Sequence, residues 1–524
     1  MHKNIYPFYF SLAVALGIML GYLLAVNSRS SDQGIWSQNK VDKLKLVQEL
    51  IYQNYVDTVD TGMIVEAGIN GMMGHLDPHS QYVPKQDFHE MNDPLLGSFE
   101  GIGIQFQIVE DTLHVIHVIK NGPSEKAGLL DGDRITYVDD SLIAGVGLSN
   151  DDVIRLLKGP KETKVKLGIH RLGVDKILEY VITRDKIPTY SIDVAFEKEG
   201  VGFIKLSSFT SSTTDEFHQA LIKLKRNGIH SLIIDLRNNT GGYLSAATAL
   251  ADELLPEGRM IVYTQGLHRR KHEYHSTAGG LWEKRNLIVL MNENSASASE
   301  ILSGAIQDND RGLIMGTRSF GKGLVQENMM LPDGSSLRLT IAKYYTPSGR
   351  CIQRPYNSLD GFEKYYYEPY TFDSLLSKDS TEFHTLNGRI VYGGGGILPD
   401  SIVTPNYDSS LTAYYQLIRK GIMYNFALKY VDENRSVLKQ NWSGDRFVKQ
   451  FQVEKVVFSK FLDYIKNSGL KLSNEDIFHS KQKIEYMLKA YIGRDLYGDE
   501  VFYPVYLEGD EIFQKAMETI KQKY

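Results

Sequence analysis

The chain has 524 residues, of which 42% are hydrophobic and 23% are charged. This balance is typical of a globular protein of two to four domains and excludes a disordered chain, a collagen and a polytopic membrane protein. The 58 Lys and Arg residues are outnumbered by 64 Asp and Glu residues, so no overall positive field favours nucleic acid. The single cysteine, Cys351, excludes an intramolecular disulfide and a multi-cysteine zinc site.

The first thirty residues are strongly apolar. No Asp, Glu, Lys or Arg occurs from Ile5 to Val26, and at ~1.5 Å per helical residue this run is long enough to cross a ~30 Å hydrocarbon core. A cleaved signal peptide has a shorter apolar stretch of roughly 7–15 residues, and the residues around Asn27 form a poor cleavage site. We therefore expect a membrane anchor over residues 1–30, with a removed signal as the alternative. The body would then lie in the periplasm of a cell envelope, anchored to the inner membrane.

Two further regions have helical periodicity. In residues 40–95, Leu44, Val47 and Ile51 fall on one face of a predicted helix, and a second amphipathic helix covers Met63 to Met73. Residues 405–524 are also helical and rich in Lys and Tyr. We expect an N-terminal helical segment and a C-terminal helical domain, and the sequence assigns no chemistry to the second.

Residues 97–186 change to short alternating strands separated by glycine turns. The order of a G-I-G-I loop, a P-S-E-K-A-G-L turn and a G-D-R-I turn resembles a PDZ domain, with an unrelated small β-barrel as the alternative. The amides of a glycine-rich loop beside a strand can hold a terminal carboxylate while the peptide adds to the sheet edge. The predicted peptide-binding loop consists of Gly101, Ile102, Gly103 and Ile104.

Residues 190–404 alternate apolar runs with helical patterns, which predicts an α/β core. Three polar segments follow its predicted strands, where sites assemble in α/β sheets. They are D-L-R-N-N-T-G-G at 235–242, N-S-A-S-A-S-E at 294–300 and G-T-R-S-F-G-K-G-L-V-Q at 316–326.

The third segment partly matches a phosphate-binding loop, G-x-x-x-x-G-K. That motif needs Ser or Thr after the lysine and a helix after the loop, but Gly323 follows Lys322 and the next residues have a strand pattern. The sequence therefore does not favour nucleotide binding.

A serine nucleophile paired with a lysine explains the segments better. Lysine can accept the proton of a hydroxyl only when it is neutral, which requires an apolar setting that lowers its pKa. Lys322 lies between glycines and beside Phe320 and Leu324, which suit such a setting. A serine at a helix N-terminus also has free amides nearby to stabilise an oxyanion, and Gly241 and Gly242 can offer an amide from a second loop.

Together these motifs resemble the C-terminal processing peptidases, PDZ-containing serine proteases of family S41. The resemblance covers nearly all of residues 40–404 and includes L-D-P-H-S at 76–80. It implies a multidomain α/β protein: a crotonase/ClpP-like protease core with an inserted PDZ domain, N-terminal helices and a C-terminal helical domain.

The resemblance also assigns roles to individual residues. It implies that Ser297 is the nucleophile, that Lys322 is the base and that Gln326 orients the lysine. The oxyanion hole would use the amides of Ala298 and Gly241. Ser295 and Ser299 remain competing nucleophiles. A Ser-His-Asp triad is a rival in principle, but none of the 14 histidines lies in a comparable motif.

The expected activity is peptide-bond hydrolysis without a metal or an organic cofactor. The expected partners are protein substrates with accessible C-termini and the membrane, and the helical tail leaves a homo-oligomer or an adaptor protein open. Two other function classes remain: a catalytically silent PDZ adaptor, and an envelope chaperone or assembly factor with secondary protease activity.

Overall fold

A computed structural model describes residues 17, 19, 35–356, 381–404 and 409–522 of the chain, which fall into two compact units, 1–82 and 83–524. The predicted anchor, Ile5 to Val26, lies almost wholly outside these residues. Within them, no helix combines the length and the apolarity needed to cross a bilayer.

The first unit consists mainly of two helices. They are α2 (Ile35–Asn54) and α3 (Thr61–Met73), and strand β1 (Gln81–Val83) follows them. Asp60 caps α3, because its carboxylate accepts hydrogen bonds from the amides of Gly62 and Met63. Apolar side chains of these helices, such as Leu44 and Met63, are largely exposed.

In the second unit, a small β-domain follows helix α4 (Lys85–Asn92) and the 3₁₀ helix η1 (Asp93–Leu96). Its six-stranded antiparallel sheet has the order β3-β4-β5-β7-β8, with β6 beside β5, and β2 pairs separately with β9. Strand β3 lies at the edge of the sheet and pairs only with β4 among the described strands. The elements are β2 (Ser98–Gly101), β3 (Ile104–Val109), β4 (Thr112–Val118), α5 (Pro123–Ala127), β5 (Arg134–Val138), β6 (Ser141–Leu142), α6 (Asn150–Leu157), β7 (Lys164–His170), β8 (Leu178–Thr183) and β9 (Asp185–Pro188).

The α/β core is built on a six-stranded sheet of order β10-β11-β12-β15-β16-β21. Strand β10 is antiparallel to β11, and the other neighbours are parallel. The predicted strands therefore occur, and they pair into one sheet. Its elements are β10 (Ile192–Lys198), β11 (Val201–Leu206), α7 (Thr213–Arg226), β12 (Ser231–Asp235), α8 (Leu244–Leu254), β15 (Asn286–Met291), α9 (Ala298–Asp308), β16 (Leu313–Gly316) and β21 (Ser401–Ile402).

Smaller antiparallel pairings complete the core. Strand β18 pairs with β13 and β17, and β13 also pairs with β14, while β19 and β20 form a hairpin of their own. The strands are β13 (Met260–Gln265), β14 (His272–His275), β17 (Leu324–Met330), β18 (Ser336–Tyr345), β19 (Glu382–His384) and β20 (Ile390–Tyr392). Because β17 begins at Leu324, just after Gly323, the strand predicted there is confirmed, and the helix that a phosphate-binding loop requires does not follow Lys322.

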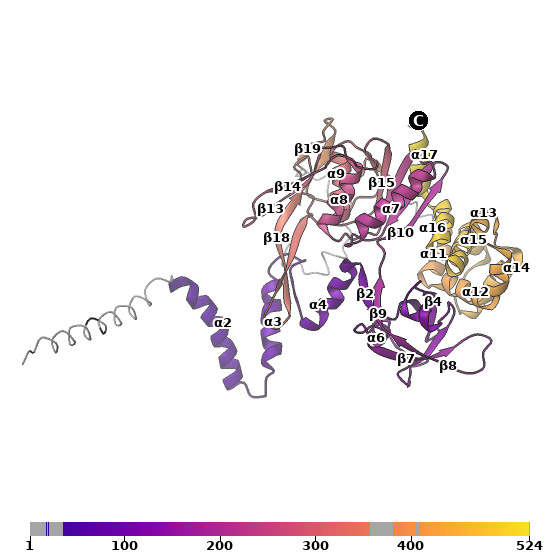
Figure 1. Ribbon diagram of the computed structural model, residues 1–524, viewed down its shortest axis with the longest axis horizontal. Coiled ribbons are helices and arrows are strands. Elements are labelled where there is room, and N and C mark those ends of the chain that lie inside the picture. Colours follow the sequence, from indigo (N-terminus) through magenta and orange to yellow (C-terminus); the bar gives the residue numbers. More distant parts are fainter. Residues whose placement is uncertain (1–16, 18, 20–34, 357–380, 405–408, 523–524) are drawn as a thin grey trace, which may run out of the picture. The chain divides into compact units, whose positions relative to one another are not determined.

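The tail is helical, as predicted (Figure 1). Its elements are η3 (Ser409–Leu411), α11 (Thr412–Arg419), α12 (Ile422–Asn441), α13 (Gly444–Gln450), α14 (Lys455–Asn467), α15 (Asn474–Tyr497), α16 (Asp499–Tyr506), η4 (Leu507–Gly509) and α17 (Glu511–Gln522).

Helices cover both faces of the core sheet. Ile204 and Ile234 pack on the side of α7, α8 and α9, whereas Phe203 and Ile233 pack against the final helix, α17. Successive strand residues point to opposite faces, so a strand buried on both faces is apolar at nearly every position. The last helix of the tail thus packs against one face of the core sheet and completes its hydrophobic core.

Candidate active site

The three polar segments meet at one edge of the core sheet. Strands β12, β15 and β16 are parallel neighbours, so the loops that follow them start side by side. A cavity of about 750 Å³ opens there, and Ser297, Lys322, Gln326 and Gly241 all line it. The structure therefore brings together the predicted nucleophile, base, orienting residue and one predicted oxyanion donor.

Ser297 differs from the two serines that flank it. It precedes α9 with φ 55° and ψ −113°, a conformation that a non-glycine residue rarely adopts, and its side chain is half-buried at the cavity. Ser295 and Ser299 are fully buried. Their hydroxyls donate to the carbonyl oxygens of Leu236 and Asn239, each at 2.8 Å. The geometry thus gives Ser295 and Ser299 structural hydrogen bonds and leaves Ser297 at the cavity.

Gly241 lies directly against the serine. A β-carbon at Gly241, whose φ is +103°, would lie 2.8 Å from Ser297 Cβ and 2.9 Å from the amide nitrogen of Ala298. Only glycine leaves this space open. The Gly241 N–H donates to Asn239 Oδ1 at 2.9 Å, so in this conformation it is already engaged. The two predicted oxyanion donors, Gly241 and Ala298, therefore lie next to each other beside Ser297. To bind an oxyanion, the Gly241 N–H would have to release its hydrogen bond to Asn239.

The described residues that line this cavity include no histidine and no carboxylate. Lys322 and Arg338 are the ionisable basic groups there, and burial lowers the pKa of Arg338. The predicted base, Lys322, and the predicted nucleophile, Ser297, thus line the same cavity.

The sequence predicted no role for Glu300, the last residue of the serine motif at 294–300. Its carboxylate is completely buried, and burial raises its pKa even though four donors surround it. Oε2 accepts from the amides of Ser297 and Lys322, each at 2.8 Å. Oε1 accepts from the Ser319 hydroxyl at 2.6 Å and from the Gly321 amide at 2.7 Å. One side chain therefore connects the backbone of the predicted nucleophile to that of the predicted base.

Tyr344 was also missed. It is buried on β18, and its hydroxyl lies 3.1 Å from the carbonyl oxygen of Ser297 and 2.6 Å from that of Lys322. The spacing of Ser297 and Glu300 is visible in the sequence as a capping box. The contacts of Glu300 with the lysine loop, and those of Tyr344, join residues far apart in the chain and carry no local signal.

The predicted peptide-binding loop also has a defined geometry. The carbonyl oxygen of Ile102 accepts from the amide and hydroxyl of Ser124, and that of Gly103 accepts from the amide of Ile119. The N–H and C=O of one peptide unit point in opposite directions, so the amides of Gly103 and Ile104 point away from these acceptors. Gly103 has φ +76°, which is suited to a backbone concavity that binds an anion.

Comparison with protein families yields four matches along the chain. They are "Activating protease CtpB N-terminal domain" over residues 24–87, "PDZ domain" over 101–180, "Peptidase family S41" over 200–360 and a family of unknown function over 413–498.

Curated relatives agree with these matches. The carboxy-terminal-processing protease of Bartonella bacilliformis is 36% identical over 348 residues, which cover 64% of this chain and 78% of the relative. The carboxy-terminal processing protease CtpB of Bacillus subtilis is 34% identical over 320 residues, 60% of this chain and 66% of the relative. Among solved structures, the photosystem II D1 C-terminal processing protease is 28% identical with a TM-score of 0.35, covering 59% of this chain and 89% of that one.

Proposed function

Because the chain belongs to peptidase family S41, as a carboxy-terminal processing serine protease with a PDZ domain, we propose that it cleaves proteins with a Ser297–Lys322 dyad. The observation that carries this proposal is the common cavity of the two residues, whose described lining contains no histidine or carboxylate. The buried, hydrogen-bonded hydroxyls of Ser295 and Ser299 support Ser297 as the nucleophile.

In the proposed reaction, Ser297 Oγ attacks the scissile carbonyl carbon while neutral Lys322 accepts the hydroxyl proton. The amides of Ala298 and Gly241 donate to the oxyanion, and Gln326 orients the lysine. Lys322 then gives its proton to the leaving amine, and the acyl-enzyme forms as the peptide C–N bond breaks. Water deprotonated by Lys322 attacks the ester, which releases the new carboxyl terminus and restores the serine.

The PDZ domain would select substrates by their free C-termini. The edge strand β3 offers unpaired backbone groups to an added strand, and the amides of Gly103 and Ile104 could then hold the terminal carboxylate. Capture at this loop would bring the rest of an unfolded substrate near Ser297.

The proposed location is the cell envelope, with the apolar run from Ile5 to Val26 in the inner membrane and the protease in the periplasm, where it would process or degrade envelope proteins. Exposed apolar side chains of α2 and α3, such as Leu44 and Met63, support a contact with a second copy or an adaptor protein. Membrane fractionation of cells expressing the full chain or a form without residues 5–26 tests the anchor: the second form should leave the membrane fraction.

The decisive experiment is cleavage of an unfolded protein by the full chain and by Ser297→Ala and Lys322→Ala. Both variants should lose at least about 10⁴-fold in kcat. Ser436→Ala and Lys439→Ala, at exposed positions of α12, are the matched controls and should keep full activity. Cleavage by Ser297→Ala would disprove the nucleophile, and inert wild-type protein would favour a binding-only function.

A second arm tests the PDZ domain. One peptide substrate is compared with a free and with an amidated C-terminus. The free acid should have the lower KM, and Gly103→Ala should erase the difference, because its β-carbon would lie 3.0 Å from Ile187 Cδ1. Equal KM values for both peptides in the wild type would refute carboxylate capture.

A further inference from the structure

A second cavity, of about 680 Å³, lies between the helical tail and the core. Its core wall comprises Lys205 and the loops that follow β12, β15 and β16, including Asn238 and Glu293, and its tail wall comes mainly from α11, α15 and α16. It shares no lining residue with the cavity around Ser297. Its volume is within the range of sites that bind small ligands or short peptide segments.

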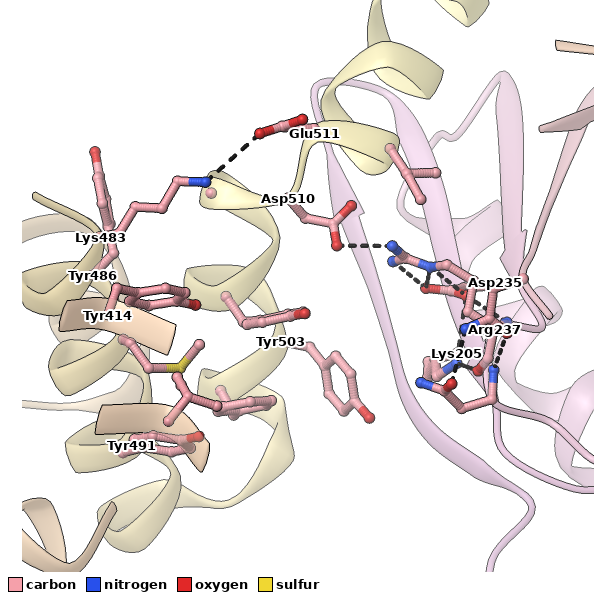
Figure 2. Close-up of a pocket in the computed structure, with 18 of the residues that line it drawn as sticks. Lys205, Asp235, Arg237, Tyr414, Lys483, Tyr486, Tyr491, Tyr503, Asp510 and Glu511 are labelled. Carbon is pink, nitrogen blue, oxygen red and sulfur yellow. Dashed lines mark hydrogen bonds and ion pairs between the residues drawn. The ribbon is translucent and has the colours of Figure 1, made fainter. Parts of the chain in front are cut away.

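The tail wall is aromatic. Figure 2 shows several of its tyrosine side chains directed toward the core. The rings of Tyr491 and Phe502 are stacked with centroids 6.1 Å apart, and those of Phe502 and Tyr506 with centroids 5.4 Å apart. The aromatic lining residues are Tyr414, Tyr415, Tyr486, Tyr491, Phe502, Tyr503 and Tyr506. Such rings present electron-rich faces, which attract cations.

The opposite wall is charged, and each of its cations already has a carboxylate partner. The Arg237 side chain donates three hydrogen bonds to the Asp235 carboxylate and one, at 2.7 Å, to Asp510 (Figure 2). Lys205 Nζ lies 3.4 Å from Asp235 Oδ1. Burial opposes ionisation of Asp235, but the charges of Arg237 and Lys205 lower its pKa to about 2. An incoming anion would therefore have to displace a carboxylate from these cations.

The carboxylates of the lining outnumber its cations. Lys483, the third cation, lies 3.6 Å from Glu511. The fourth carboxylate, Glu293, is exposed and accepts a hydrogen bond from the Thr317 hydroxyl at 3.0 Å. Among the described residues Glu293 has no cationic partner. The cavity thus combines aromatic faces with a surplus negative charge at its rim.

From this combination we propose that the cavity binds the guanidinium group of an arginine side chain in a protein or peptide. A guanidinium is planar, stacks on aromatic rings and pairs with a carboxylate through two parallel donors. The same aromatic cluster already has such a contact from within the chain, because the Arg494 guanidinium lies 5.0 Å from the centroid of Phe502. The tail, whose family has no assigned function, thereby becomes a docking module for basic segments, separate from both the PDZ loop and the catalytic dyad.

The test is calorimetric titration of the full chain with the capped peptide Ac-Gly-Gly-Arg-Gly-Gly-NH₂. The amidated end prevents capture by the PDZ loop, and peptides with Lys, Gln or Glu in place of Arg are titrated alongside. The arginine peptide should bind most tightly, the lysine peptide more weakly, and the glutamine and glutamate peptides most weakly. N-acetylglucosamine and inorganic phosphate, titrated as probes of a sugar or an anion site, should not bind.

Two variants locate the site. Glu293 is exposed, and 40% of the surface of Tyr486 is exposed, so both can be changed without disturbing the core. Glu293→Gln and Tyr486→Leu should each weaken the arginine peptide about five- to thirtyfold. Glu382→Gln and Tyr190→Leu, at exposed positions outside the cavity, should not. Equal affinity for the Arg and Gln peptides, preference for the sugar or phosphate, or binding unaffected by both cavity variants would each overturn the proposal.

Discussion

Replacing Glu300 by glutamine is expected to lower kcat about a hundredfold while the protein stays folded. The carboxylate holds the amides of Ser297 and Lys322 on one oxygen, and the Gly321 amide and the Ser319 hydroxyl on the other. It is the described side chain whose hydrogen bonds reach the backbone amides of both proposed catalytic residues. Its substitution therefore tests whether their alignment depends on this one group.

The magnitude follows from counting acceptors. Glutamine has one oxygen, so its NH₂ group must face either the Ser297–Lys322 pair or the Gly321 amide. A buried N–H left without an acceptor costs about 1–3 kcal/mol. Removing the charge offsets part of that cost, because burial raises the pKa of Glu300 and thus disfavours its ionised form. The free energy of unfolding should therefore change by no more than about 2 kcal/mol. No such compensation applies to kcat, because a shift of about 1 Å between the proposed nucleophile and base misaligns the reacting atoms.

The assay is kcat and KM on a fluorogenic peptide, with the free energy of unfolding measured on the same samples. We expect kcat to fall and KM to stay near the wild-type value, because the substrate-binding surface is unchanged. Glu257→Gln, at an exposed position of the core, is the matched control. A kcat within threefold of wild type would refute the reasoning, as would a loss of kcat fully explained by a smaller folded fraction.

Three further outcomes are expected. Gly241→Ala should lower kcat about a hundredfold, because its β-carbon would lie 2.8 Å from Ser297 Cβ. The control is Gly279→Ala, where φ is also positive (+100°) but no atom lies within 4 Å of the new β-carbon. It should cost only about 1 kcal/mol in the free energy of unfolding. Ser299→Ala should lose about 1–2 kcal/mol in the same assay but keep kcat within a few-fold, the reverse of Ser297→Ala. Burial raises the pKa of Asp495 to about 7, above its unfolded value of about 3.9. The free energy of unfolding should therefore fall as the pH rises from about 3.9 to about 7. Asp495→Asn should remove this pH dependence and be roughly 1–3 kcal/mol more stable than the wild type at pH 8.

Much of the fold could be predicted because its signals are local. The amphipathic helix predicted over Met63 to Met73 lies within α3 (Thr61–Met73), and the strand pattern that follows Gly323 is β17 (Leu324–Met330). Because parallel strands end at a common edge of the sheet, the sequence was sufficient to predict that the three polar segments lie close together. The roles of Ser297, Lys322 and Gln326 remain predictions that the cleavage experiment tests.

The features that could not be predicted depend on distant contacts. Nothing around Phe513 in the sequence indicates that α17 covers the face of the sheet that presents Phe203. Similarly, Asp235 and Arg237 belong to a motif grouped with the protease segments, yet both line the second cavity, and Arg237 binds Asp510 of the tail. A helical pattern predicts which face of a helix is buried, but not which surface buries it.

The spacing of the serine motif can be explained by what each position must do. Ser297 adopts a backbone conformation that costs on the order of 1–3 kcal/mol, so its surroundings must hold it there. Glu300 binds its amide, and the Tyr344 hydroxyl and the amides of Glu300 and Ile301 lie at its carbonyl oxygen. Each of these partners also touches the lysine loop or begins helix α9. The strained backbone at Ser297, the proposed nucleophile, and the position of the loop that carries Lys322, the proposed base, therefore depend on the same hydrogen bonds. A change that relaxes one should misplace the other.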